Sequence, residues 1–301
     1  MATITTALSY GFLLAILAIG SYITFSILRI PDLTSDGTFC LGAVISGVLA
    51  MTGHPWLGLL AGVAVSALAG LCTGLIATGL KISPILSGVL VATGLVTIID
   101  WIPEWFDQTP SFYLRANTMA KTIFDGASDV WTKILIICAI IAILIVILLI
   151  FFQTQLGLTI RATGNNEEMV KASSINADRM KHIAFALSNG IIGLAGGLYV
   201  QFSRSYSNTM GNGMLITALA SIIIAEVIFG KRKLKFALPL TVAGAVIYRF
   251  IVALVIKFVG QNAIKLGTAL IVIIAIALSQ YKNKFLDQRK LKRLNTEKEV
   301  K

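Results

Sequence analysis

The residues that could carry chemistry in this chain are few, and long apolar segments separate them. The two histidines, His54 and His182, and the three cysteines are not spaced as a nucleophilic triad or as metal ligands. The one Gly-Lys pair, Gly230-Lys231, is followed by Arg232 and lacks the pattern of a nucleotide-binding loop around it. The sequence therefore predicts no catalytic residue, no metal site and no cofactor bound by this chain.

Arg249 lies near the middle of an apolar segment, residues 236–257. If that segment crosses a membrane, the charge costs at least about 2.5 kcal/mol on insertion scales and should face a bundle interior or a wet cavity. Glu226 is its candidate partner and the one acidic residue that we expect to be buried in a span, although it lies nearer the end of its own segment. Two interpretations stay open: an ion pair with Glu226, or a polar path on which Arg249 meets an anionic group.

Two uncharged polar residues, Asn189 and Ser87, also lie within apolar segments, residues 183–201 and 84–101. Such side chains can line a path through the membrane. They can also form hydrogen bonds between helices, which is the commoner use. We keep both residues as candidates for the path together with Arg249 and Glu226.

The composition indicates a membrane protein. Of the 301 residues, 56% are hydrophobic and 13% charged, whereas soluble domains carry about 25% charged residues. Apolar runs near the roughly 20 residues that cross a bilayer recur along the chain. We therefore predict an all-α polytopic membrane helix bundle with about nine transmembrane helices, as one domain over residues 1–281, followed by a basic tail, 282–301. The expected spans are residues 6–28, 38–52, 56–80, 84–101, 131–152, 183–201, 213–229, 236–257 and 266–281.

The formal charge of +11 is distributed as in a membrane protein rather than a nucleic-acid-binding protein. With the C-terminus in the cytoplasm, most of the 25 Lys and Arg residues fall on the cytoplasmic side, as the positive-inside rule requires. All four tryptophans then lie at the outer interface. The sequence thus predicts a multi-pass protein of the bacterial cell membrane with its N-terminus outside, and a basic tail that attracts anionic membrane lipid.

Small residues are spaced for close helix packing. Gly58 and Gly62, Gly70 and Gly74, and Gly193 and Gly197 each form a Gly-x-x-x-Gly pair, which lets helices approach in a membrane. The orientation also makes residues 38–152 and 183–281 two units of four spans, an arrangement compatible with a parallel internal repeat. Before the first unit, we expect Asp32, Ser35 and Asp36 to cap a helix that begins near Thr38.

The polar segment 153–182 is the most informative part of the sequence. Gly164 is expected to break the chain, Asn165 or Asn166 to cap a short amphipathic helix, and Glu167 and Glu168 to lie in its first turn, where the helix dipole favours negative charge. That helix should end near Ser174. Because spans hold it at both ends, it would form a rigid projection suited to docking into the groove of a partner.

This segment closely resembles the coupling segment of permeases in bacterial ABC importers of the branched-chain amino acid and ribose type. The family pattern AxGxNxxxAxxxGIN is matched by Ala162, Gly164, Asn166, Ala172, Ile175 and Asn176. Ser174 stands where the family usually has glycine, the residue that commonly ends a helix. Together with the pattern of spans, the resemblance covers about four-fifths of the chain.

The resemblance implies a subunit of a larger importer. Its partners would be cytoplasmic ABC ATPase subunits, which bind ATP and Mg, an extracellular solute-binding protein, and a second copy of this chain. The chain looks most like single-permease systems, some of them linked to tryptophan or other aromatic amino acids, which implies a homodimer and an amino-acid solute. The outer segment 102–130 could receive the binding protein or could be a solvated connector. A stand-alone secondary transporter or channel is the alternative, although such proteins usually need intramembrane acidic residues.

Overall fold

The computed structural model describes residues 2–114, 119–127, 129–230 and 232–259, together with 269, 270, 273 and 277. These residues form mainly helices. In chain order the elements are α1 (Ala2–Tyr22), the π-helical turn η1 (Ile23–Ile27), α2 (Ser35–Met51), α3 (Pro55–Gly79), α4 (Pro84–Glu104), β1 (Ser111–Tyr113), α5 (Val130–Phe151), α6 (Gln155–Asn165), α7 (Glu167–Ala172), α8 (Ala177–Ser203), β2 (Ser205–Ser207), α9 (Met214–Phe229) and α10 (Leu234–Val259).

Six helices in the described part of the chain are long and apolar enough to cross a membrane: α1 with η1, α3, α4, α5, α8 and α10. Two apolar helices are shorter, α2 with 17 residues and α9 with 16. The prediction of a polytopic helical bundle is therefore confirmed. The count of nine stays a prediction, because most of the last expected span, 266–281, and the whole basic tail lie outside the described residues.

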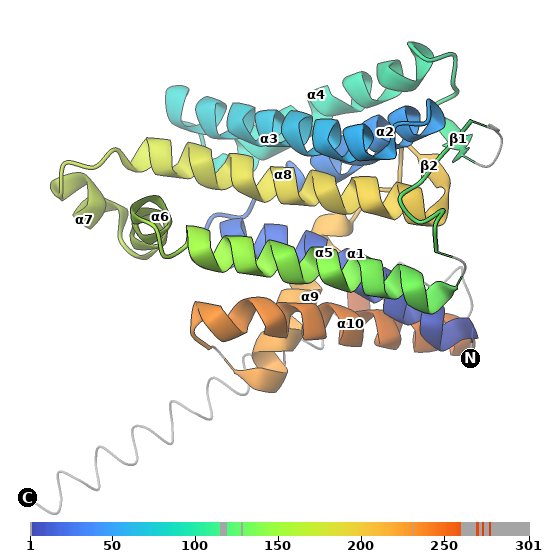
Figure 1. The fold of residues 1–301 in the computed structure, drawn as a ribbon. Helices are drawn as coiled ribbons and strands as arrows, with labels where there is room; N and C mark the ends of the chain where they lie inside the picture. The colour runs from blue at the N-terminus through green and yellow to red at the C-terminus, as the bar shows by residue number, and fades with distance from the viewer. Residues whose placement is uncertain are drawn as a thin grey trace, which may run out of the picture.

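The long helices lie side by side, and the connections between them gather at two opposite ends (Figure 1). At one end, α6 and α7 project beyond the bundle. At the other, β1 pairs antiparallel with β2, with Phe112 opposite Tyr206. Helix α9 is inclined steeply to the others in Figure 1 and lies between α1 and α10. The fold thus presents two chemically different ends joined by an apolar body.

The centre of the bundle is held by close backbone contact between α2, α3 and α8. A Cβ atom on Gly42 would lie 2.2 Å from the carbonyl oxygen of Gly193, and one on Gly193 would lie 2.4 Å from Cβ of Ser66. Gly70 of α3 packs in the same way against Phe185 and Asn189 of α8. A Cβ atom on Gly62 of α3 would lie 3.0 Å from the carbonyl oxygen of Gly42. Glycines from all three predicted Gly-x-x-x-Gly pairs therefore serve helix packing, which in a membrane depends on van der Waals contact.

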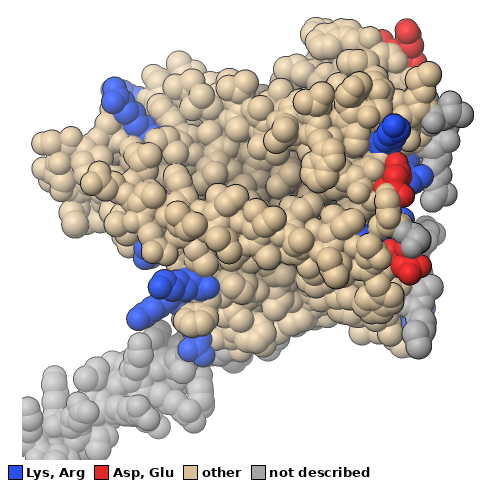
Figure 2. Space-filling view, viewed as in Figure 1, with Lys and Arg blue, Asp and Glu red and all other residues tan. Residues whose placement is uncertain are grey.

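On the surface of the molecule, charged side chains gather at the two ends. On the face shown in Figure 2, Lys and Arg lie at the end that carries α6 and α7, Asp and Glu lie at the opposite end beside further Lys and Arg, and a broad uncharged band separates them. The exposed tryptophans Trp56, Trp101, Trp105 and Trp131 all flank the β1–β2 end of helices α3, α4 and α5. Indole rings at one rim of an apolar band are typical of a membrane interface.

The connection between α1 and α2 corrects one prediction. Helix α2 begins at Ser35 rather than near Thr38, and its N-cap residue, Thr34, makes no side-chain capping bond. Asp32 accepts a hydrogen bond from the Thr34 backbone, 2.9 Å. Asp36 instead points away from its own helix and accepts bonds from the start of α9. Tertiary contact, rather than local capping, therefore decides where these two carboxylates lie.

Candidate coupling segment and membrane path

Helix α6 lies against the end of α1 and η1. The Thr154 hydroxyl caps it by accepting a hydrogen bond from the Gly157 backbone, 3.3 Å. Gly164 lies inside α6 and touches the backbone at Ile27, where a Cβ atom would stand 1.9 Å from the carbonyl oxygen. The expectation that Gly164 breaks the chain is therefore wrong. Gly164 is helical and the last residue but one of α6, and glycine is required there because the backbone of α6 sits directly on that of η1.

The short helix α7 forms as expected, and Asn166 rather than Asn165 caps it. The Asn166 side-chain oxygen accepts a hydrogen bond from the Met169 backbone, 3.0 Å, while Asn165 is the last residue of α6. Glu167 and Glu168 occupy the first turn of α7. One oxygen of Glu167 lies 2.7 Å from the ammonium groups of both Lys171 and Lys181. The second of these bonds ties α7 to α8.

These bonds also set the acidity of Glu167. Its hydrogen bonds to Lys171 and Lys181 hold the carboxyl pKa below the ordinary value of 4.5. Since the carboxylate is the bonded form, the stabilisation is present above the ordinary pKa and is lost as the pH falls through the lowered one.

Ser174 ends the short helix in the left-handed conformation, with φ of 60°. The left-handed region favours glycine, which explains why the family pattern usually has glycine at the position of Ser174. The next element begins at once, because the Asn176 side chain accepts a hydrogen bond from the Arg179 backbone, 3.0 Å, and so caps α8. The turns before and after α7, in which the Asn166 and Asn176 side chains cap the following helix, thus fix α7 between α6 and α8.

The outer face of α7 and the turn after it are open to solvent. Met169 is 63% exposed and Ile175 40% exposed, although both are apolar. Glu168 and Ala172 are exposed as well, whereas Val170 is buried and holds the helix to the body. The segment therefore presents a small apolar surface, Met169 and Ile175, on a supported helix.

Asn189 lies in a buried polar network rather than on an open surface. Its amide nitrogen donates to Asp32, 2.6 Å, and to the Phe185 carbonyl, 3.0 Å, while its oxygen accepts from the Thr38 hydroxyl, 2.7 Å. The whole side chain is inaccessible to solvent. These contacts link α8, α2 and the segment before α2, and they favour the hydrogen-bonding interpretation of Asn189.

Ser87 is buried in the first turn of α4, and its hydroxyl donates to the Pro84 carbonyl, 2.9 Å. The neighbouring Gly88 faces the backbone at Leu33 and Thr34. Ser87 therefore lies beside the segment between α1 and α2, and it does not contact Arg249 or Glu226.

Arg249 and Glu226 lie beside different parts of α1, so their ion pair, one of the two interpretations left open, is not supported. The Arg249 guanidinium lies over the ring of Tyr10, 5.1 Å from its centre. Glu226 lines a cavity together with Tyr22. Tyr10 and Tyr22 are both on α1 and are separated by about 18 Å along its axis at about 1.5 Å per residue. The two charges lie at different depths of the bundle, and the sequence could not show this because it gives no register between α9 and α10.

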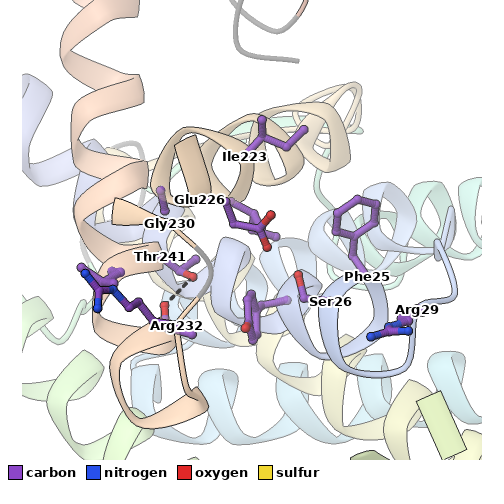
Figure 3. A pocket seen from close by; sticks show the side chains of 13 residues that line it. Phe25, Ser26, Arg29, Ile223, Glu226, Gly230, Arg232 and Thr241 are labelled. Atoms are coloured by element: carbon purple, nitrogen blue, oxygen red, sulfur yellow. Dashed lines mark hydrogen bonds between the residues drawn. The ribbon is translucent and has the colours of Figure 1, made fainter. Parts of the chain in front are cut away.

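The cavity that contains Glu226 lies between α1, η1, α9 and α10 at the end where α6 and α7 project. It encloses about 630 Å³. Figure 3 shows the Glu226 carboxylate directed into its centre near Ser26, with Arg29 and Arg232 at opposite sides of the opening. The Arg232 side chain donates to the Phe229 carbonyl, 3.2 Å. The arrangement is a polar chamber with an acid inside and two cations at its rim.

Besides Glu226, three acidic residues lie within the bundle, where the sequence argument did not expect them. Asp32 is buried, Asp36 lies in the first turn of α2, and Asp100 lies in α4, where it accepts a hydrogen bond from Asn208, 3.1 Å. The statement that Glu226 is the one buried acid is thus wrong. A usable signal was present, because Asp32 and Asp36 fall in a short polar stretch between two apolar runs, too short for a solvated loop.

Comparison with known proteins gives a consistent result. Residues 3–277 match the model of a family described as "Branched-chain amino acid transport system / permease component". A tyrosine transport system permease protein of Clostridioides difficile is 31% identical over 92% of this chain and 91% of its own length. A "probable branched-chain amino acid transport permease protein" of Methanocaldococcus jannaschii is 26% identical over 96% and 93%. A solved structure described as "An inward-facing conformation of a putative metal-chelate type ABC transporter" matches with a TM-score of 0.47 and 17% identity, over 93% of this chain and 85% of that one.

Proposed function

Because this chain belongs to the permease family of branched-chain amino acid transport systems, we propose that it forms the membrane path of an ATP-driven importer for a small solute, an amino acid. The chain is a multi-pass membrane transport subunit, and a separate ATPase is its partner in such systems. Two relatives carry names of amino acid transport, one for tyrosine and one for branched-chain amino acids, and these names support the proposed solute class.

The observation that carries the proposal is the supported, exposed helix α7. Met169 and Ile175 expose apolar side chains on a segment that is otherwise mostly polar and charged, as expected of a surface that a partner protein covers. Val170, Asn166 and the bond from Glu167 to Lys181 hold the helix to the body. A partner ATPase that grips this surface would move α6 and α8 with it as a rigid body.

The coupling route follows from the packing of α6. Gly164 brings α6 into backbone contact with η1, and α8 continues directly from the Asn176 cap into the centre of the bundle. A displacement of the coupling segment would thus reach α1 and α8 without a flexible linker between them. We assign this end to the cytoplasm, the N-terminus to the outside and the C-terminus to the cytoplasm, on the distribution of Lys and Arg.

The remaining parts of the importer are proposed on the same basis. Two ATPase subunits bind ATP and Mg, an extracellular solute-binding protein delivers the solute at the β1–β2 end, and a second copy of this chain completes the path. Helices α4 and α5 expose about half of their residues, which leaves ample surface for lipid and for that second copy.

The test of the coupling role is Met169→Asp in the complex with the partner ATPase. A charge on the docking surface should weaken capture of the ATPase in detergent about tenfold, since burying an unpaired carboxylate is costly. Lys81→Ala, exposed at the same end on the α3–α4 connection, should leave capture unchanged. Equal capture by both variants, or solute uptake by this chain without an ATPase, would contradict the proposal and favour a stand-alone transporter.

Arg249 tests the path itself. Its guanidinium faces Tyr10 in the interior rather than a carboxylate, which leaves it able to meet an anionic group of the solute. Arg249→Ala should abolish uptake in proteoliposomes while the complex still assembles. Lys257→Ala, near the end of the same helix, serves as the control, and normal uptake by Arg249→Ala would remove Arg249 from the path.

A further inference from the structure

Two helices of the bundle begin at the same place inside it. At 17 and 16 residues, α2 and α9 reach about 25 Å, less than the roughly 30 Å of a bilayer core. The Asp36 carboxylate of α2 accepts hydrogen bonds from the backbone of Gly213, 3.0 Å, and Leu215, 2.7 Å, at the start of α9. Gly37, beside Asp36, packs against Leu95, midway along the full-length helix α4.

The segment that leads into α9 is bound to the first turns of α2. The Gly211 backbone donates to the Cys40 sulfur, 3.0 Å, and the Cys40 thiol donates to the Asn208 carbonyl, 3.4 Å. A Cβ atom on Gly211 would lie 2.2 Å from the Asp36 carbonyl oxygen. Irregular backbone at this depth is tolerated only where protein buries it or where it lines a cavity, and broken helices in transporters commonly mark such a cavity.

A pocket of about 240 Å³ lies at this junction, between α2, α4 and the segment before α9. Its polar lining includes Asp36, Asp100, Asn208, Asn212 and Thr93. None of the residues that line it is Lys or Arg. Asp100 receives one bond, from Asn208, so its carboxylate keeps acceptor capacity for a further donor. The pocket therefore offers two negative charges and amide groups within the bundle, between the middle of α4 and the end of α4 that carries Trp101.

We propose that this pocket binds the ammonium group of the transported solute, with Asp100 as its main acceptor. The inference rests on the proposed function, and it adds a substrate-binding role for the α2–α4–α9 junction. An ammonium group fits because it carries one positive charge and three donors, enough for Asp100 and the side-chain oxygens of Asn208 and Asn212, which line the same pocket. Asp36 is already engaged by the start of α9 and contributes mainly its charge.

The test measures protection of an engineered cysteine in the full permease–ATPase complex, with Cys72 and Cys138 replaced by alanine. Val96→Cys lines the pocket and should react with a maleimide. Ile98→Cys is exposed on α4 outside the pocket and is the matched control. The probes are L-tyrosine, tyramine, which lacks the carboxylate, 3-(4-hydroxyphenyl)propionate, which lacks the amine, and sodium chloride.

Tyrosine and tyramine should both slow labelling of Val96→Cys, whereas the deaminated acid should not, and Ile98→Cys should be unaffected. Asp100→Asn should weaken this protection about tenfold or more, as expected for loss of a hydrogen bond to a charged group. Asp100→Asn is used because Asp36→Asn would also disturb the start of α9.

Protection by sodium alone, protection by the deaminated acid, or undiminished protection in Asp100→Asn would each overturn the ammonium site. Capture of the ATPase in the same preparations tests the importer assignment separately. Retained capture with no protection by either amine would reject this site and leave the proposed function standing.

Discussion

The centre of the bundle and the coupling segment are held together by different forces. At the centre, Gly42 and Gly193 bring α2 and α8 into backbone contact, and Asn189 makes three hydrogen bonds that solvent never reaches. In the coupling segment, side-chain caps and half-exposed ion pairs fix a helix of six residues. The centre resists change in shape, whereas the segment at the end is firm in place and open to a partner.

This contrast suits a division of labour in one chain. A rigid centre moves as a body, since packed interiors adopt discrete arrangements rather than deforming continuously. Because α7 is held to this rigid centre through α6 and α8, a partner that displaces α7 would displace the centre with it. The two regions should therefore respond to substitution on different scales and in different measurements.

The largest effect is expected for Gly42→Val at the centre. The added Cβ atom would overlap the backbone of Gly193, which cannot move without separating α2 from α8. We expect loss of monodisperse protein in detergent, measured by size-exclusion chromatography. Gly79→Ala, where a Cβ atom meets nothing within 4 Å, should express and elute normally. Normal behaviour of Gly42→Val would show that the centre is more adaptable than its packing implies.

Asn189→Leu should have the next largest effect. It removes the amide that bonds Asp32, 2.6 Å, and leaves a buried carboxylate with fewer partners. We expect destabilisation of about 2–4 kcal/mol, seen as a lower midpoint of thermal unfolding. The matched variant Asn212→Leu changes an exposed asparagine and should shift the midpoint much less. Equal shifts would mean that the buried network does not stabilise the centre.

A smaller effect, of opposite sign, is expected for Ser174→Gly in the coupling segment. Ser174 has φ of 60°, which costs a residue with a side chain about 1 kcal/mol relative to glycine. The variant should slow amide hydrogen exchange in α7 and leave global unfolding unchanged. Ser173→Gly, one residue earlier and without positive φ, should instead speed exchange. Faster exchange in Ser174→Gly would mean that the turn is not strained.

The smallest effect concerns the pH dependence of α7. The bonds from Lys171 and Lys181 lower the Glu167 pKa, so their stabilisation is present above pH 4.5 and is lost as the pH falls through the lowered pKa. Solvent screening limits it to about 0.5 kcal/mol or less. Amide exchange in α7, corrected for intrinsic rates, should accelerate over that range in the wild type but not in Glu167→Gln. Parallel profiles for the two proteins would contradict the role of these ion pairs.

Local chemistry was predictable from the sequence. The apolar runs gave the long spans because hydrocarbon thickness sets their length. Asn166 at the start of α7 and the glycine-like position of Ser174 followed from capping rules that involve only neighbouring residues. The glycine pairs indicated where helices would approach, although they did not show which helices would meet.

The depth of each side chain in the bundle and the direction in which it points were decided by the tertiary structure alone. Arg249 faces Tyr10 instead of Glu226 because the register of one helix against another depends on side-chain packing that spacing along a chain does not encode. Gly164 looked like a break and instead supports a backbone contact with Ile27. Asp36 looked like a cap for its own helix and instead serves the start of α9, 177 residues later in the sequence, because both helices begin within the bundle and share one carboxylate.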